Sequence, residues 1–303
     1  MDMGNLIVAL VGLVVLIAVL GTIIALAYFA YRKKAREQKN YERALKMVQI
    51  MIHLPPSSDD KEVGSRDIRD VTDETVSQAQ TMYNVIASTA TKGFHSRLYG
   101  QRHITFEIVA NDGLIHYYTA VPYVLLDNVK QAIMAAYPTA RLEEVPEINL
   151  FSRAGKMSGT LGGELVLDKP YTFPIATYKD SKRDAMGAIL NALSMATRGD
   201  GVGIQILLRP ARDDWTRKIE DQVQDIRDGK KGASKGRRGP DWGYFAQILE
   251  ALWKPPTSTG KDGDVKPLSG TDQARVEAME EKARHAGYEV MIRLIVSTPN
   301  SGR

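Results

Sequence analysis

The sequence predicts an α+β protein in which one N-terminal transmembrane helix is followed by two packed units of strands and single helices. Three observations predict this architecture. Residues 6–31 carry no charge, residues 103–122 alternate between apolar and polar side chains, and helical spacing of apolar residues returns between the later strand-like stretches. The chain of 303 residues is long enough for one large domain or two small ones.

The predicted transmembrane helix is the uncharged run of residues 6–31, which is rich in Leu, Ile, Val, Ala and Gly. About 26 residues at a rise of about 1.5 Å each extend about 39 Å, more than the ~30 Å hydrocarbon core of a bilayer. A signal peptide has a basic start and an apolar core of about 7–15 residues, whereas residues 1–5 contain no basic residue. A core helix of a soluble domain would need a polar face, and this run has none. Residues 1–31 are therefore predicted to be a permanent single-pass anchor.

A basic block follows the anchor directly. Residues 32–46 contain seven Lys or Arg and two Glu, which gives a net charge of +5. This asymmetry predicts an inner-membrane protein with its N-terminus outside and its bulk in the cytoplasm. The block either binds anionic lipid of the bilayer or serves only as an orientation signal. The predicted membrane-interface residues are Tyr28, Phe29, Tyr31, Arg32, Lys33, Lys34 and Arg36.

Residues 32–65 are predicted to form a basic juxtamembrane helix and a loop, with the helix ending at Pro55 and Pro56. Leu45, Val48 and Ile52 would form one apolar stripe on this helix. A second helix is predicted at residues 66–92, where apolar residues recur every three or four positions. Its stripe either faces the core or forms a self-association seam, and the core is the favoured alternative. The stripe consists of Ile68, Val71, Thr75, Ala79, Met82 and Ile86.

The first α+β unit is predicted at residues 66–150. Two alternating stretches flank Asn-Asp-Gly at 111–113, a strong signal for a β-hairpin. A helix at about 124–137 ends before Pro138, and residues 140–145 return as a strand. The order of elements is therefore β-β-α-β.

The second unit is predicted at residues 151–303. Its predicted strands are 163–169, 173–179, 201–210 and 288–297, and its predicted helices are 181–197, 212–228 and 271–286. Met186, Ile189, Leu190 and Leu193 would face inward from the first of these helices. The Gly-rich stretch 159–164 is predicted to be a turn. Strands separated by single helices predict two packed ferredoxin-like units of the split β-α-β kind.

An insertion at 229–270 interrupts the second unit. Its Gly-rich start carries five positive charges without interleaved aromatic residues, which makes it a weak candidate for nucleic-acid contact; these residues are Lys230, Lys231, Lys235, Arg237 and Arg238. An amphipathic helix is predicted at 241–253. It docks on a partner, lies on the membrane surface or packs on its own domain, and these alternatives stay open. Its apolar side consists of Trp242, Phe245, Leu249 and Leu252.

No arrangement typical of catalysis is present in the sequence, so no catalytic, cofactor or metal residue is predicted. The chain has no cysteine and no G-x-x-x-x-G-K-[ST] motif, and its five histidines are scattered. Glu143 and Glu144 would point to opposite faces of a strand. Asp213 and Asp214 lie at a predicted helix start, where carboxylates complement the helix dipole. The chain is accordingly predicted not to be an enzyme.

Several stretches resemble one protein family: "ALKMVQIMIHLPPSS", "YGQRHITFEIVA", "QAIMAAYPTARLEEV", "GGELVL", "RDAMGAILNALS" and "GIQILLRPA". They are similar to the membrane-anchored N-terminal region that precedes a DNA-translocase-type P-loop ATPase in certain bacteria, notably the candidate-phyla radiation. Those ATPases are related to type IV secretion and conjugative-transfer ATPases. The resemblance covers roughly residues 40–300 and carries no active residues to this chain.

The resemblance implies a cytoplasmic platform that positions a P-loop ATPase motor, in cis or in trans, or contacts secretion-channel proteins. It also implies a homo-oligomer. The motor itself is missing from these 303 residues, so the chain is expected to be a fragment of a longer ATPase. The alternative is a stand-alone membrane scaffold that recruits a partner through the 241–253 helix. A membrane-tethered DNA binder is a third, weaker hypothesis.

Overall fold

The computed structural model describes residues 3–54, 68–111, 113–148, 159–177, 185–197, 199–212, 214–228 and 268–298. Its contacts divide the chain into two compact units, which are described separately. The sheet unit comprises Met1–Leu165, Ala185–Ala211 and Tyr288–Arg303. The helical unit comprises Val166–Asp184 and Arg212–Gly287.

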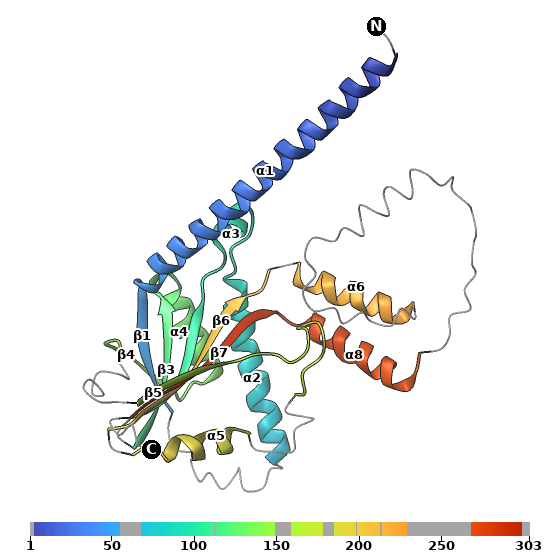
Figure 1. Cartoon of the computed structure of the whole chain (residues 1–303). Helices are drawn as coiled ribbons and strands as arrows, with labels where there is room; N and C mark the ends of the chain where they lie inside the picture. Colours follow the sequence, from blue (N-terminus) through green and yellow to red (C-terminus); the bar gives the residue numbers. More distant parts are fainter. Residues whose placement is uncertain are drawn as a thin grey trace. The chain divides into compact units, whose positions relative to one another are not determined.

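The N-terminal element is one unbroken helix, α1 (Met3–Ala44), which confirms the predicted long apolar helix (Figure 1). After α1 the chain turns through Leu45 and Lys46, where the Lys46 N–H donates to the Arg43 carbonyl at 3.1 Å. The next element is strand β1 (Met47–His53). The predicted continuation of the helix to the Pro55–Pro56 pair is therefore wrong. Alternating β-branched side chains in "MVQIMIH" suit a strand, and pairing on both sides fixes it.

Seven antiparallel strands form one sheet in the order β4-β1-β3-β2-β6-β7-β5. The other strands are β2 (Ile104–Asn111), β3 (Leu114–Pro122), β4 (Arg141–Val145), β5 (Gly159–Leu165), β6 (Gly201–Pro210) and β7 (Tyr288–Thr298). The predicted hairpin is confirmed, because Asn111 pairs with Leu114 and Gly113 has a φ of +83°. β2 pairs with β6, so strands predicted for two separate units belong to a single sheet.

Two helices cover one face of this sheet: α2 (Ile68–Ser88) and α4 (Leu126–Ala136), the latter preceded by the short helix η2 (Tyr123–Leu125). Met82 and Ile86 of α2 are buried in the core, so the apolar stripe of this helix faces the sheet, whereas Thr75 of the predicted stripe is exposed. The core cluster consists of Ile50, Met82, Ile86, Ile104, Val121, Val129, Ala132, Ile133, Ala136 and Leu208.

An aromatic group ties β7 to this core. The ring of Tyr83 on α2 makes edge contacts with Phe106 on β2 and with Tyr288, the first residue of β7, each with centroids 6.1 Å apart. The Tyr288 hydroxyl donates to the Tyr83 carbonyl. Burial raises the pKa of Tyr288, so this hydroxyl stays protonated as a donor.

Three predictions in the second half of the chain are wrong. Residues 159–164 form most of strand β5 instead of a turn, because they pair along β7. Residues 173–177 form no strand. Met186 of helix α5 (Ala185–Ser194) is exposed, although Leu193 of the same helix is buried. The short helix α3 (Phe94–Tyr99) was not predicted at all.

The helical unit contains the helices α6 (Trp215–Arg227) and α8 (Gly270–Arg284), which confirms both predicted helices. They pack through Ile219, Val223, Val276 and Met279. Gly287 follows α8 at a close approach to Trp215: a Cβ at this glycine would lie 2.4 Å from the indole ring. Only glycine fits there without moving the ring.

The core prediction compares two neighbouring residues of α4. Ile133 is 2% exposed and Met134 is 46% exposed. Ile133→Ala should lower the free energy of unfolding by about 2–5 kcal/mol, because the buried cavity can collapse only in part. Met134→Ala, the matched control, should change it by about 0.5 kcal/mol or less. Urea unfolding of the full chain in detergent micelles, followed by circular dichroism, measures both, and equal losses would contradict this core.

Candidate membrane anchor and juxtamembrane site

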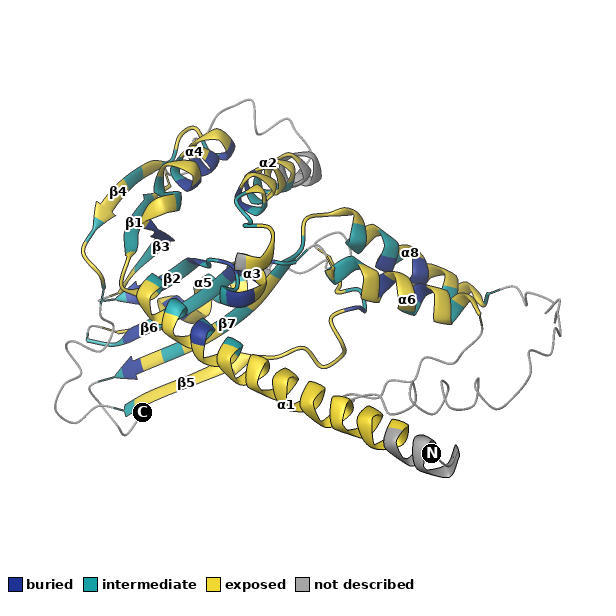
Figure 2. Cartoon of the chain, turned by 90° about the horizontal axis from the view of Figure 1, so that it is seen from above, coloured by how far each residue is buried: buried dark blue, intermediate teal, exposed yellow. Residues whose placement is uncertain are grey.

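The apolar part of α1 is exposed from Leu10 to Tyr31. α1 is long and apolar enough to cross a membrane, and none of its most apolar window is buried inside the protein. Figure 2 shows this part of the helix in the colour of exposed residues. A core helix would be covered by its own domain, so the exposed surface of α1 needs an apolar environment from outside the chain. Tyr28 and Phe29 contact each other edge to face near the end of this part.

The basic part of α1 has two different faces. Residues at helical spacing turn toward the sheet unit and are buried or half-buried: Arg32, Ala35, Arg36, Lys39, Asn40 and Arg43. We call this stripe the docking face. Lys33, Lys34 and Gln38 lie outside this stripe and are exposed. The small side chain of Ala35, which is 8% exposed, lets the helix approach the domain closely. The predicted interface residues therefore divide, with the lysines turned outward and the arginines toward the domain.

Two arginines of the docking face bind the end of α3. Arg36 donates to the carbonyls of Arg97 at 2.9 Å and Leu98 at 3.2 Å. Arg43 donates to the carbonyls of Tyr99 at 3.2 Å and Gln101 at 3.0 Å. The last four carbonyls of a helix have no partner within the helix. Here the Gly100 N–H donates to the Ser96 carbonyl, and the two guanidinium groups donate to the other three carbonyls. Cations are also favourable at this negative end of a helix dipole.

The loop that carries α3 is itself held by Gln101, which is 6% exposed. Its side-chain amide donates to the Thr91 carbonyl at 2.6 Å and accepts from the N–H and hydroxyl of Thr91, each at 2.8 Å. These bonds close the segment from Thr91 to Gln101 at its base. α1 is thus attached to a fixed platform of the sheet unit.

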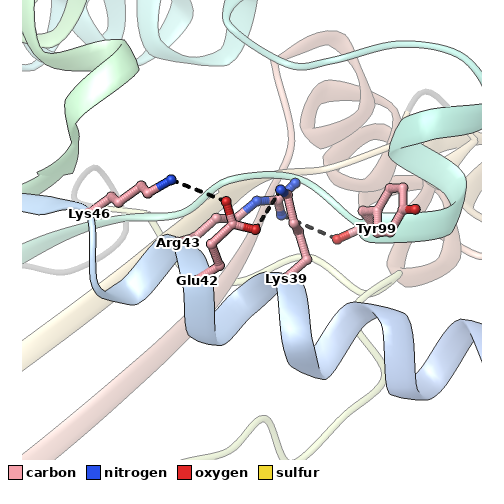
Figure 3. Close-up of polar contacts among 5 residues, drawn as sticks. All are labelled: Lys39, Glu42, Arg43, Lys46 and Tyr99. Atoms are coloured by element: carbon pink, nitrogen blue, oxygen red, sulfur yellow. Dashed lines mark hydrogen bonds and ion pairs between the residues drawn. The ribbon is translucent and has the colours of Figure 1, made fainter.

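Glu42 lies between two lysines on α1, as Figure 3 shows. Its carboxylate pairs with Lys39 at 2.7 Å and with Lys46 at 3.2 Å. The hydrogen bonds of Lys39 and Lys46 lower the pKa of Glu42. The pairs are exposed and contribute little to stability. They do reduce the net charge available on this turn, whereas Lys33 and Lys34 remain exposed.

A second group of positive charges lies where the docking face meets the sheet. Burial lowers the pKa of His103, and the charges of Arg209, Arg43 and Arg293 lower it further. Burial also lowers the pKa of Arg43, and the charges of Arg102 and Arg209 lower it further. We call Arg43, Arg102, His103, Arg209 and Arg293 the cationic cluster. Glu289 lies 3.7 Å from Arg209, and the buried Nε atoms of Arg43 and Arg209 have no hydrogen-bond partner among the described residues.

The sequence singled out Arg32 and Arg36 as membrane-interface residues, not as contacts to the domain, and it singled out neither Arg43 nor Gln101 nor the cationic cluster. Arg43 was detectable, since it follows Arg36 by seven residues and so shares its helix face. No local signal identified the others, because α3 was not predicted and Arg209 lies far away in sequence.

A shallow hollow of about 390 Å³ on α1 is lined by Phe29, Arg32, Lys33, Arg36, Glu37 and Asn40.

The remaining candidate residues are only partly covered by the structure. The basic stretch from Lys230 to Arg238 and the helix with Trp242, Phe245, Leu249 and Leu252 lie outside the described residues. Glu143 and Glu144 do point to opposite faces, since Glu143 pairs with His53 and Glu144 with Lys130 of α4. Among the described residues, no group of three or more His, Asp or Glu side chains is arranged to hold a metal ion.

Comparison with known proteins places the chain in a family. Residues 57–302 match the family model "Domain of unknown function (DUF8128)", which is well over half of the chain, so the protein belongs to this family. Neither the search of curated proteins nor the search of solved structures returned a match.

The cationic cluster makes stability depend on pH. Because the pKa of His103 is lowered in the folded state, the unfolded chain takes up a proton below about pH 6.5 that the folded chain resists. Stability should therefore fall as pH decreases from 7 to 5. His103→Asn should make this fall smaller in urea titrations at several pH values.

His53→Asn is the matched control, because this exposed histidine of β1 pairs with Glu143 and does not belong to the cationic cluster. A pH dependence that is the same in His103→Asn and the wild type would contradict the assigned electrostatics of the cluster.

Proposed function

We propose that the chain is the membrane-anchored cytoplasmic platform domain of a type IV secretion or conjugation-type ATPase. The platform would position the motor or contact channel partners, and the motor would carry out the chemistry. The observation that supports this most is the attachment of α1 to the sheet unit. An anchor that serves only to localise a protein needs no fixed contact with its domain, whereas α1 is bound through Arg36 and Arg43 and continues after two residues into β1.

The proposed topology has the N-terminus outside and the sheet unit in the cytoplasm. No Lys or Arg precedes the apolar part of α1, and the basic residues begin directly after it. Lys33 and Lys34 are exposed at the predicted headgroup level, where they would contact anionic lipid of the inner membrane. We propose the same location for Tyr28 and Phe29, whose rings suit the interface between hydrocarbon and headgroups.

The proposed fold of the platform is ferredoxin-like. The order β1-α2-β2-β3-α4-β4, with strands arranged as β4-β1-β3-β2 and both helices in one core, fits a β-α-β-β-α-β unit. The strands β6, β7 and β5 would be a second, incomplete unit of this kind that extends the same sheet. A broad sheet is a suitable base for positioning another domain.

The test combines the gene and the protein. Reading the source gene beyond the codon for Arg303 tests for a motor in cis. Purification of the tagged full chain from carbonate-washed native membranes, with mass spectrometry and 8-azido-ATP labelling, tests for a motor in trans. We expect the chain in the membrane fraction, together with a P-loop ATPase either in the same polypeptide or in near-stoichiometric amount.

The control is an unrelated single-pass protein with the same tag, purified from the same cells. Recovery of the chain in the soluble fraction would contradict the anchor. A membrane-bound chain without an ATPase in cis or above the control level in trans would contradict the platform function and leave the scaffold with its 241–253 helix as the alternative.

A further inference from the structure

Strand β5 leaves one edge of the sheet unprotected. It pairs with β7 on one side and is the outermost described strand on the other. Its sequence GTLGGEL contains one charged residue, Glu164, and no proline. The opposite edge strand, β4, carries Arg141, Glu143 and Glu144 within five residues. Charges and prolines are the usual means by which edge strands avoid pairing with another chain, so β4 is protected and β5 is not.

The sheet face beside this edge is apolar and exposed. In register, Leu161 lies opposite Val296 and Leu165 opposite Ile292, and Ile292 lies opposite the core-facing Ile206. These residues therefore share the face that α2 and α4 cover further along the sheet. Here they remain open: the exposed fractions are Leu161 75%, Leu165 57%, Val290 53%, Leu294 38% and Val296 38%. Figure 2 shows β5 in the colour of exposed residues. A contiguous apolar patch of this kind marks an interaction surface.

We propose that β5 pairs with β5 of a second copy of this chain, antiparallel and centred on Gly163, so that the two sheets become one. The occupant must supply a strand, because unpaired backbone N–H and C=O groups along an edge are satisfied by another strand and not by a helix. A second copy fits because the strand is complementary to itself about a two-fold axis. This inference does not depend on the proposed ATPase partner.

The register follows from the side chains. Centring the pair on Gly163 places Leu161 opposite Leu165 of the second copy, and Leu165 opposite Leu161, on the apolar face. Glu164 then lies opposite Gly162. Centring on Gly162 would leave both leucines opposite glycines, and centring on Glu164 would oppose two carboxylates. Within its own chain Glu164 is in register with Arg293 of β7. Two anchored copies would also meet at high effective concentration in the membrane plane.

Disulfide cross-linking of the full chain tests the register, since the protein has no native cysteine. A Cβ at Gly163 meets no atom within 4 Å, and a Cβ at Gly162 meets only the Leu294 carbonyl at 3.7 Å, so both positions accept cysteine. At the two-fold centre, the Cβ atoms of Gly163→Cys would be about 4.5–5.5 Å apart, whereas Gly162→Cys in two copies would be diagonal at about 7–8 Å. Under mild oxidation in liposomes, Gly163→Cys should give about tenfold more covalent dimer. Equal or absent cross-linking would overturn the proposal.

Charge substitutions provide the second test, by sedimentation of the full chain in detergent micelles over a range of concentrations. Leu161→Lys and Leu165→Glu should each weaken the dimer by about tenfold or more, because each places a charge against a leucine twice. The double variant places Lys opposite Glu in both pairs and should recover most of the affinity. A double variant no better than the weaker single variant, or a wild type that is monomeric throughout, would overturn the proposal. Circular dichroism checks that each variant is folded, and the cysteine variants test the register independently.

Discussion

The arrangement of this protein depends on two arginines of a long helix that bind the carbonyl end of a short one. Hydrogen bonds that involve a charged donor contribute about 1.5–3 kcal/mol each when shielded, and less when half-exposed as here. Arg36 and Arg43 make four such bonds, three to α3 and one to the Gln101 carbonyl after it. The same groups satisfy helix-end carbonyls that have no partner within α3. Removing either arginine would therefore leave carbonyls without partners, and removing both would release α1 from α3.

This attachment gives the sheet unit a defined relation to its anchor. α1 is followed after Lys46 by β1, which is an inner strand with β3 on one side and β4 on the other. Both sides of this connection are held. Gln101 fixes the segment of α3, to which α1 is bound, and Ile50 of β1 is buried in the core. A displacement of α1 would be transmitted to the sheet instead of being absorbed by a linker. The cationic cluster, including Arg43 itself, lies at this junction.

Much of the fold could be predicted from local patterns, and the errors have physical causes. The hairpin at Asn111–Leu114 and the helices α6 and α8 were predictable, because turn residues and apolar spacing determine them nearly alone. β1 was mistaken for a helix because Leu45, Val48 and Ile52 also fit a helical stripe, and only pairing with two other strands decides between the alternatives. β5 was mistaken for a turn because its glycines suggest one, and its partner β7 lies more than 120 residues later.

The candidate site was predictable only where it depends on sequence neighbours. The exposed apolar run and its basic border identify α1, and helical spacing would have linked Arg36 with Arg43. The carbonyls that these arginines bind belong to α3, which has six residues and no side-chain cap at its start. A helix that short is stabilised by its tertiary contacts and leaves little trace in the sequence.

The central claim is that α1 and the sheet unit move as one body, and a pulsed electron paramagnetic resonance distance tests it most directly. Because the chain has no native cysteine, spin labels can be placed at Gln38→Cys, on the exposed side of α1, and at Leu114→Cys, 63% exposed beside the hairpin. A second pair of labels at Leu114→Cys and Tyr123→Cys, both exposed and both within the sheet unit, gives the width of the distance distribution for a rigid reference. In lipid nanodiscs the account predicts a single distance between residues 38 and 114, with a distribution as narrow as that of the reference pair. This distribution should broaden when Arg36 and Arg43 are both changed to alanine. A broad distribution in the protein with both arginines intact would contradict it.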